Sequence, residues 1–260
     1  MSKVGKINLK NSTGVKDAVL KVVEEIGGFK KFVKTGDVIF LKPNYNTADP
    51  SPASTSVDFL KSVVELVYDF GAKLAMIGES STVTLNTRKI MEKSGVLELL
   101  KMETPPRIYI FEEEVWVKKE IPGAKYLKSV SVPEILERAD KLILLPCLKT
   151  HKQARYTGAL KLSVGFMKPA QRVSLHLTNL QKKIADLNKI IHPDLVIMDA
   201  RKCFISGGPM KGVVREPDLI LASEDRVAID IEGVKIIQSF EGNSLAGINP
   251  EDLPQIANSR

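Results

Sequence analysis

Cysteine is scarce in this 260-residue sequence, which contains only Cys147 and Cys203, and neither belongs to a C-x-x-C pair. So few cysteines exclude a disulfide framework, and they exclude a zinc ribbon or an iron–sulfur cluster held by this chain alone. Long apolar runs are also absent, because none approaches the roughly 18 residues that cross a bilayer. The N-terminal sequence MSKVGKINLK has no hydrophobic signal region. We therefore expect a cytoplasmic protein with no membrane segment.

Acidic residues are missing from one segment of the chain. Residues 141–185 contain nine lysines and arginines and no aspartate or glutamate, whereas the rest of the chain has 29 basic and 31 acidic residues. The net charge of +7 therefore originates in this segment. A positive excess confined to one segment suggests an anionic partner. With 43% hydrophobic and 27% charged residues, the chain as a whole has the composition of a folded globular protein.

Short apolar runs alternate with helical patterns along the chain. Continuous apolar runs bounded by turn residues are typical of buried strands, and we expect such strands at 38–41, 74–77, 142–145, 195–198 and 219–222. Apolar residues at helical spacing predict helices over 55–70, 132–139, 180–191 and 226–240. This order predicts one α/β domain over residues 1–260, with a mostly parallel twisted sheet and helices on both faces. Less regular stretches at about 80–130 and 150–175 leave room for a small inserted lobe.

Polar and ionisable residues follow four of the predicted strands. Ligands of open parallel sheets bind beyond the carboxyl ends of the strands, so these residues are candidates for one shared site. The first two strands are followed by Lys42, Asn44, Glu79 and Ser80, and the next two by Lys149, His151 and Asp199. The lysines would bind an anion, which Asn44 and Ser80 would orient. His151 or Asp199 would move a proton.

Three of these candidates also have a purely structural interpretation. Lys42 could be an exposed strand terminus, and Glu79 could simply pair with a neighbouring lysine. Asp199 could cap a helix instead of acting as a general base. The sequence alone leaves both interpretations open for each residue.

Two of the three histidines, His151 and His176, lie in the segment without acidic residues. Nearby positive charge disfavours the charged form of imidazole, so both rings should be neutral near pH 7. A neutral imidazole can act as a base or as a metal ligand, although the sequence does not identify a metal. The alternative is that both are surface histidines.

Two glycine-containing segments complete the set of candidates. In residues 156–165, Gly158 and Gly165 allow a close approach of the backbone to a ligand or to packed neighbours. Thr157 and Gly158 are candidates for substrate binding, and Lys161 lies among apolar residues. A desolvated Lys161 would have a lowered pKa, which suits a base or Schiff-base role, but its amine could equally reach solvent. In the loop 206–212, the backbone N–H groups of Gly207 and Gly208 could bind an anion. The dinucleotide motif G-x-G-x-x-G and the P-loop motif are both absent.

An ordered set of short motifs resembles the domain of unknown function 362 family over about residues 38–240. The motifs include Leu41-Lys42-Pro43-Asn44, Ile77-Gly78-Glu79-Ser80, Lys149-Thr150-His151, Thr157-Gly158-Ala159-Leu160-Lys161, His176, Asp199 and Gly208-Pro209. The resemblance implies an α/β protein, and many members are fused to a ferredoxin-type domain with iron–sulfur clusters. This chain has no such cysteine array, so any electron transfer would need a separate ferredoxin-like partner. The family is distantly similar to the nickel-dependent lactate racemases, a similarity that does not carry a nickel cofactor over to this chain.

The leading hypothesis is an enzyme, either an isomerase or racemase or an oxidoreductase, that acts on a small carboxylate or phosphate by lysine- and histidine-assisted proton transfer. A nucleic-acid-binding module using residues 141–185 is one alternative, but only Tyr156 and Phe166 provide aromatic rings there. Another alternative is a non-catalytic subunit of an iron–sulfur protein complex. The sequence also allows a homo-oligomer, and it identifies neither the substrate nor a cofactor.

Overall fold

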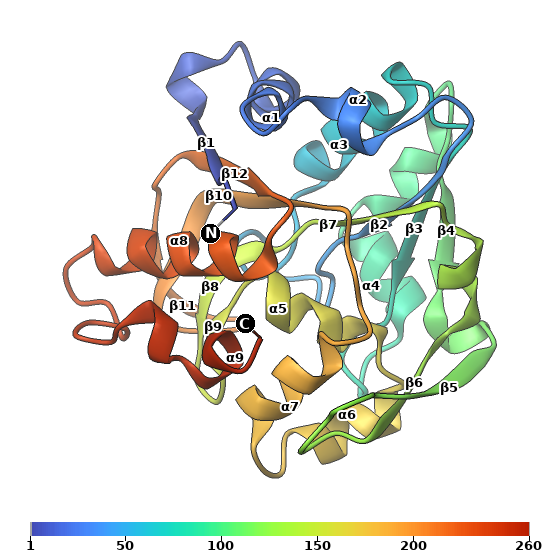
Figure 1. Cartoon of the computed structure of the whole chain (residues 1–260). Helices are drawn as coiled ribbons and strands as arrows, with labels where there is room; N and C mark the ends of the chain where they lie inside the picture. Colours follow the sequence, from blue (N-terminus) through green and yellow to red (C-terminus); the bar gives the residue numbers. More distant parts are fainter. Residues whose placement is uncertain (1, 260) are drawn as a thin grey trace.

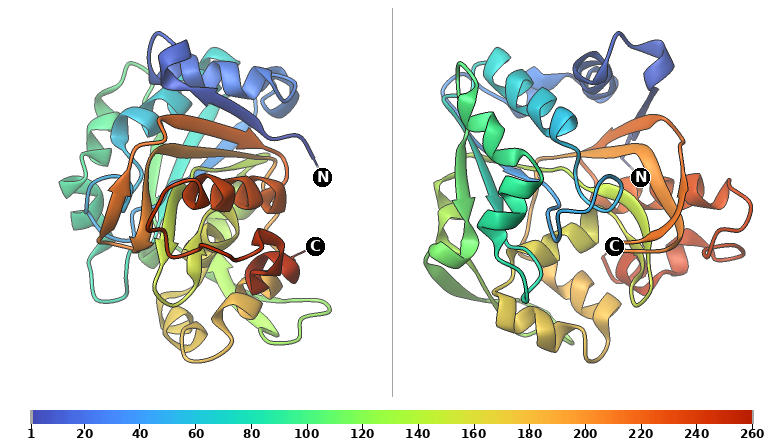
Figure 2. Two further views of the ribbon diagram at one scale, coloured as in Figure 1. Left: turned by 90° about the vertical axis from the view of Figure 1, so that its left-hand side faces the viewer. Right: turned by 180° about the vertical axis from the view of Figure 1, so that it is seen from behind.

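The central feature of the fold is a twisted sheet with helices packed on both of its faces (Figures 1 and 2). The computed structural model describes residues 2–259. Within these residues the large sheet has ten strands, and a separate sheet has two. Seven strands of the large sheet follow the order β1-β12-β10-β7-β2-β3-β4, while β8 and β11 pair with β10, and β9 pairs with β8. The α/β class with a mostly parallel sheet, expected from the sequence, is thereby confirmed.

The elements have the following bounds. The strands are β1 (Gly5–Asn8), β2 (Val38–Lys42), β3 (Leu74–Glu79), β4 (Arg107–Ile110), β5 (Trp116–Glu120), β6 (Ser129–Pro133), β7 (Lys141–Leu144), β8 (Cys147–His151), β9 (Arg155–Thr157), β10 (Leu195–Gly207), β11 (Gly212–Arg215) and β12 (Leu219–Ser223). The α-helices are α1 (Val15–Glu24), α2 (Phe29–Phe32), α3 (Val57–Asp69), α4 (Thr87–Lys93), α5 (Ala159–Leu162), α6 (Pro169–Leu175), α7 (Leu180–Leu187), α8 (Arg226–Gln238) and α9 (Pro254–Ala257).

Parallel pairing at the centre of the sheet brings strand ends together at one edge. β10, β7, β2, β3 and β4 run parallel, with Phe40 of β2 opposite Met76 of β3 and Leu142 of β7. β12 and β1 extend the sheet beyond β10 in the antiparallel sense. The carboxyl ends of β2 and β3, at Lys42 and Glu79, therefore lie side by side, where ligands of parallel sheets bind.

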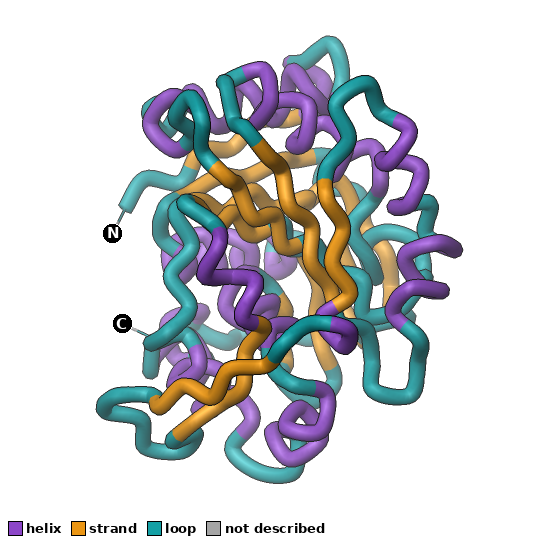
Figure 3. Tube along the Cα trace, turned by 90° about the vertical axis from the view of Figure 1, so that its right-hand side faces the viewer, coloured by secondary structure: helices purple, strands orange, loops and turns teal. Residues whose placement is uncertain are grey.

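Two hydrophobic cores cover the two faces of the sheet, as the alternation of side chains along a strand requires. In β2, Ile39 and Leu41 pack in a core with residues of α1, α2, α3 and α4. Phe40, which lies between them, belongs to the opposite core, with residues of α5, α7, α8 and α9. Figure 3 shows the strands enclosed by helices and loops. Burial on both faces explains why the central strands are continuous apolar runs in the sequence.

Three segments differ from the expectations of the sequence analysis. β10 continues to Gly207, well past the expected end at residue 198, because its second half pairs with β8 and β11. The helix expected over 132–139 is the end of β6 followed by a 3₁₀ helix, Glu134–Arg138. Residues 149–151, expected to follow a strand, themselves belong to β8. In the part of the chain that the structure describes, no helix combines the length and hydrophobicity that crossing a bilayer requires.

Candidate functional site

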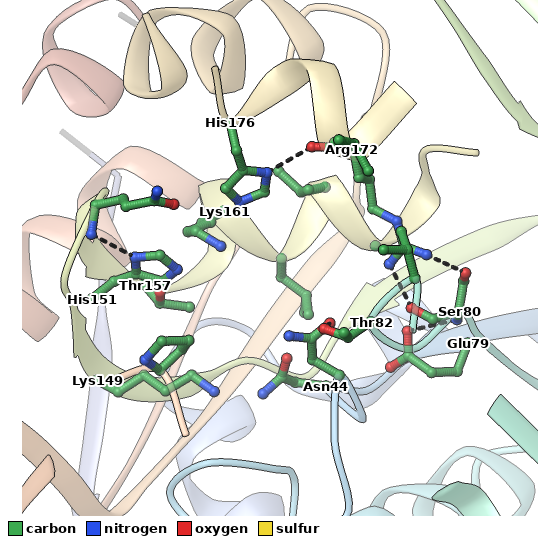
Figure 4. Close-up of a pocket in the computed structure, with 18 of the residues that line it drawn as sticks. Asn44, Glu79, Ser80, Thr82, Lys149, His151, Thr157, Lys161, Arg172 and His176 are labelled. Carbon is green, nitrogen blue, oxygen red and sulfur yellow. Dashed lines mark hydrogen bonds between the residues drawn. The ribbon is translucent and has the colours of Figure 1, made fainter. Parts of the chain in front are cut away.

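A cavity of about 430 Å³ lies beyond the carboxyl ends of β2 and β3 (Figure 4). Its walls also include residues of β8, β9, α5 and α6. Nine of the thirteen residues singled out from the sequence line it, namely Lys42, Asn44, Glu79, Ser80, Lys149, His151, Thr157, Lys161 and His176. Segments that are far apart in the chain thus line one cavity. The residues after the first two strands share it, as expected for the carboxyl ends of parallel strands.

The pairing of β8 with β9 explains why three of these residues share one wall. Lys149 and His151 are two positions apart in β8, so their side chains project from the same face of the strand. Antiparallel pairing sets Thr157 of β9 directly opposite Lys149. The Thr157 hydroxyl is buried and has no hydrogen-bond partner among the described residues. This strand pair therefore offers an amine, an imidazole and a free hydroxyl to the cavity.

Lys42 and Glu79 form a closed ion pair at the ends of β2 and β3. Nζ of Lys42 donates to Oε1 of Glu79 (2.6 Å) and to the carbonyl of Pro43 (2.7 Å). Glu79 also accepts the backbone N–H groups of Tyr45 (2.6 Å) and Ser80 (2.8 Å). Burial lowers the pKa of Lys42, and the Glu79 carboxylate opposes that shift. Each charge of this pair is balanced by the other, which agrees with the interpretation that Glu79 pairs with a neighbouring lysine.

Lys149 and Lys161 face the cavity without a carboxylate partner among the described residues. Nζ of Lys149, whose side chain is buried, donates only to the carbonyl of Ala53. Burial lowers the pKa of Lys149. Lys161 is half-buried, and burial, together with the charges of Lys149 and Arg172, lowers its pKa to about 8. An ammonium group has three N–H donors, so both lysines keep donors for a bound anion.

The two histidines are held in opposite tautomers. Nδ1 of His151 accepts the backbone N–H groups of Gln153 and Ala154, both at 3.1 Å, so the ring proton lies on Nε2. Nδ1 of His176 lies 2.6 Å from the carbonyl oxygen of Arg172, which can only accept, so this nitrogen carries the proton. Nε2 of His176 therefore keeps a lone pair. The first ring is a hydrogen-bond donor, and the second is a base.

The pKa values of both rings favour the neutral form. Burial lowers the pKa of His151 to about 2, and the charges of Lys161, His176 and Lys149 act in the same direction. Burial also lowers the pKa of His176, while its hydrogen bond to the carbonyl of Arg172 opposes the shift. His151 thus remains a neutral donor at physiological pH, which does not suit the proton-accepting role suggested by the sequence.

Arg172 is a charged cavity residue that the sequence analysis missed. It is buried in α6 and donates to the carbonyls of Ser80 and Ser81, both at 2.8 Å, and to the Ser80 hydroxyl at 2.6 Å. That hydroxyl donates in turn to Glu112 (2.5 Å). Arg172 therefore ties α6 to the loop after β3 and fixes two walls of the cavity. A single arginine in an irregular segment gives no recognisable sequence signal.

Asp230 of α8 binds the start of α5, the helix that carries Lys161. Its carboxylate accepts the backbone N–H groups of Ala159 (2.7 Å) and Leu160 (3.0 Å), at the start of the helix that carries Lys161. Burial raises the pKa of Asp230 to about 7, and these two N–H groups oppose the shift. The position of Lys161 therefore depends on a carboxyl group that lies 69 residues later in the chain.

Asp199 lies outside the cavity. Its Oδ1 accepts Nε of Arg201 (2.9 Å), and its Oδ2 accepts the Ser56 hydroxyl (2.8 Å) and the Arg201 terminal nitrogen (2.8 Å). The sequence analysis placed Asp199 at a strand end, but β10 continues beyond it, so the residue lies within the strand. This carboxylate binds the guanidinium of Arg201 and the hydroxyl of Ser56, and it does not line the cavity.

The three candidate glycines also lie outside the cavity, and close packing accounts for them. A Cβ at Gly158 would lie 2.1 Å from Oδ1 of Asp230, and a Cβ at Gly208 would lie 2.0 Å from the carbonyl oxygen of Thr150. Gly207 pairs within the β10–β11 hairpin, and the N–H of Gly208 is already donated to a carbonyl of the hairpin turn. The N–H of Gly208, one of the two amides expected to bind an anion at this loop, is therefore occupied.

A metal site made by the protein alone is not formed in the described residues. No group of three histidine, cysteine, aspartate or glutamate side chains in residues 2–259 comes together in a way that could hold a metal ion. In the cavity, Nδ1 of His151 is occupied by backbone donors, which leaves Nε2 of His176 as an imidazole acceptor. The described residues therefore do not provide the set of protein ligands that a nickel ion would need.

The sequence matches the family described as Domain of unknown function (DUF362) over residues 39–235. The chain belongs to this family. Every cavity residue named above lies within the matched range, so the site is built from the part of the chain that defines the membership. The resemblance inferred from the motifs is confirmed.

Individual proteins are also similar to this chain, in sequence or in structure. A thylakoid-associated protein of Synechocystis sp. is 28% identical over 250 residues, which cover 91% of this chain and 71% of that protein. The lactate racemase apoprotein from Thermoanaerobacterium thermosaccharolyticum is similar in structure, with a TM-score of 0.60 and 11% identity, over 87% of this chain and 56% of that chain. A protein from Thermotoga maritima has a TM-score of 0.44 and 14% identity, over 73% and 50% of the two chains.

These relatives limit what can be carried over to the present chain. It spans little more than half the length of the lactate racemase structure, and at 11% identity the similarity concerns the fold. The name of the Synechocystis relative associates it with thylakoids, so the cytoplasmic location expected from the sequence stays a prediction.

Proposed function

We propose that the cavity binds a small anionic substrate, a carboxylate or a phosphate, and that the protein is an enzyme that transfers a proton to and from this substrate. The observation that carries the proposal is the presence of two lysines, Lys149 and Lys161, that face the cavity without a carboxylate partner among the described residues. Holding unpaired cations away from bulk water costs folding free energy, and an anionic ligand would offset that cost.

The anion would lie between the two lysines and the wall of β8 and β9. The ammonium groups of Lys149 and Lys161 would donate to its oxygens, with the Thr157 hydroxyl as a further donor. The Nε2–H of His151 is also available as a neutral donor. Donors held in fixed positions in a partly dehydrated space stabilise developing negative charge better than water does.

His176 is the group in this set that can accept a proton. For a carboxylate substrate, the C–H bond next to the carboxylate would break, the proton would pass to Nε2 of His176, and the electron pair would move to the carboxylate oxygens. The lysines and His151 would stabilise that enolate-like charge. Return of the proton would restore the substrate or its mirror image. The racemase name of the structural neighbour denotes the same overall outcome, the interconversion of mirror images.

The distribution of the basic residues supports this proposal over nucleic-acid binding. Three of the nine basic residues in 141–185 line the cavity, namely Lys149, Lys161 and Arg172. A fourth, Lys141, is paired with Asp194 at 2.9 Å. The charge of this segment is therefore directed in part into a cavity of about 430 Å³, which is too small for a duplex. A separate redox partner stays a prediction from the sequence.

The proposal is tested by exchange of the substrate's α-proton in D₂O, followed by proton NMR over a panel of small carboxylates. A turned-over substrate should lose its α-proton signal with the native protein. His176→Gln should slow this exchange by about 10²- to 10⁴-fold, because it removes the base. His192→Gln is the matched control, since His192 is exposed and lies outside the cavity. No exchange of any carboxylate would contradict proton transfer to a carboxylate substrate, and exchange unaffected by His176→Gln would contradict the role of His176 as the base.

A further inference from the structure

Exposed apolar side chains gather at the mouth of the cavity. Ten large hydrophobic side chains are exposed in the described residues, and three of them, Val83, Val173 and Leu177, line the cavity. Their exposed fractions are 47%, 53% and 75%. Because they line the cavity and still reach solvent, they form its edge, which we call the apolar rim. Clustering of exposed apolar groups around one opening marks a binding surface.

Lys149 and His151 lie deeper than the apolar rim. Lys149 is 2% exposed and His151 is 8% exposed, whereas Leu177 at the rim is 75% exposed. Most protein surfaces have the opposite arrangement, with charged side chains outside and apolar side chains inside. A ligand that matches this cavity carries a charged group that enters first and an apolar part that remains near the opening.

The apolar rim is held in place by hydrogen bonds. Val173 follows Arg172 in α6, and Val83 lies on the loop that begins with Ser80 and Ser81. The hydrogen bonds from Arg172 to these two serines tie the two sides of the rim together. A preformed opening lowers the ordering cost of binding, so its apolar surface can contribute to affinity.

We infer that the substrate class of this site is an amphipathic carboxylate, with an aliphatic chain or an aromatic ring that contacts the apolar rim while the carboxylate reaches Lys149 and Lys161. This inference rests on the proposed function and goes beyond it by naming the substrate class. The cavity volume of about 430 Å³ supports it. This volume lies in the range of about 300–1,000 Å³ found for sites that take drug-sized ligands, well above the needs of a three-carbon acid.

Isothermal titration calorimetry with acetate, butanoate, hexanoate and octanoate tests the inference. Affinity should rise about fourfold for each methylene that the rim covers, which corresponds to about 0.8 kcal/mol per group. Octanol should bind more weakly than octanoate because it lacks the charge. Equal affinity along the series would overturn the inference and leave the proposed function standing. Failure of every carboxylate and also of inorganic phosphate to bind would overturn the proposed function itself.

Variants of the apolar rim separate a ligand contact from other uses of the same surface. The double variant Val173→Ser, Leu177→Ser should lose the dependence on chain length and keep the affinity for acetate. Val115→Ser, which removes a side chain that is 62% exposed and outside the cavity, should change neither. Retention of the full chain-length dependence in the double variant would overturn the inference. Rim-dependent binding to phosphatidylcholine vesicles without binding of octanoate would also overturn it, because the rim would then be a membrane contact.

Discussion

Two buried lysines at the same edge of the sheet differ in one respect, their partners. Lys42, at the end of β2, is paired with Glu79 at 2.6 Å and donates to a neighbouring carbonyl. Lys149, in β8, is buried to a similar degree but has a single carbonyl acceptor and no carboxylate. Burial of a charge is tolerated when the charge is paired, so the first lysine belongs to the framework. In the proposed function, a ligand brings the charge that pairs with the second.

Residue type and burial alone therefore do not distinguish a lysine that stabilises the fold from one that is proposed to bind a ligand. Both side chains line the cavity, and burial lowers the pKa of both. What separates them is the carboxylate of Glu79, which Lys42 has and Lys149 lacks. Substitutions at the two positions should therefore have opposite effects on stability and on binding.

The largest effect is expected for Lys42→Met. The substitution leaves Glu79 buried without its cation, so the free energy of unfolding should fall by about 3–5 kcal/mol in urea denaturation. Lys141→Met is a control at a half-exposed ion pair, where a loss of about 0–1 kcal/mol is expected. The double variant Lys42→Met, Glu79→Gln should recover part of the loss, because it removes the unpaired charge and keeps an oxygen that can accept a backbone N–H. An unchanged unfolding free energy for Lys42→Met alone would remove the distinction between the two lysines.

A smaller effect of opposite sign is expected for Lys149→Met. Removing a buried ammonium that lacks an ion pair should leave the free energy of unfolding unchanged or raise it by up to about 2 kcal/mol, as often happens at binding sites. Octanoate affinity, measured by calorimetry, should fall by about tenfold or more, because charged hydrogen bonds contribute about 1.5–3 kcal/mol each. A loss of several kcal/mol of stability with normal binding would make Lys149 a framework residue like Lys42.

The smallest effect is a pH dependence of binding set by Lys161. Its pKa of about 8 means that the amine is protonated below pH 8 and neutral above it. Anion affinity should therefore be constant at lower pH and fall by up to about tenfold per pH unit above pH 8. Lys161→Arg, which keeps its charge, should move this decline to higher pH. Titrations of both proteins at several pH values check the prediction, and identical pH profiles would contradict it.

Much of the fold could be predicted from the sequence because the central strands are buried on both faces. The apolar runs at 38–41 and 195–198 correspond to β2 and to the start of β10, and the stripe over 55–70 corresponds to α3 (Val57–Asp69). The second half of β10 mixes polar and apolar residues without regular alternation, and its strand conformation depends on pairing with β8 and β11. That extension could not be predicted locally, which is why Asp199 was placed at a strand end.

The site was predictable in its residue types and not in its chemistry. Lys149 and His151 were found because polar residues follow an apolar run, and the structure places both in the cavity. Their roles depend on contacts that the sequence does not reveal. The tautomers of His151 and His176 are set by backbone groups, and the ion pair of Lys42 joins residues 37 positions apart. Such contacts exist only once the chain is folded.

A crystal structure of the protein with ω-bromooctanoate tests most directly whether Lys149 and Lys161 bind the carboxylate. The anomalous signal of bromine locates the far end of the ligand. The carboxylate should lie within hydrogen-bond distance of Nζ of Lys149 and Nζ of Lys161, with bromine near Val173 and Leu177. The Lys42–Glu79 pair should remain closed. A carboxylate bound to Lys42, or a bromine deep in the cavity with the carboxylate in solvent, would contradict the account.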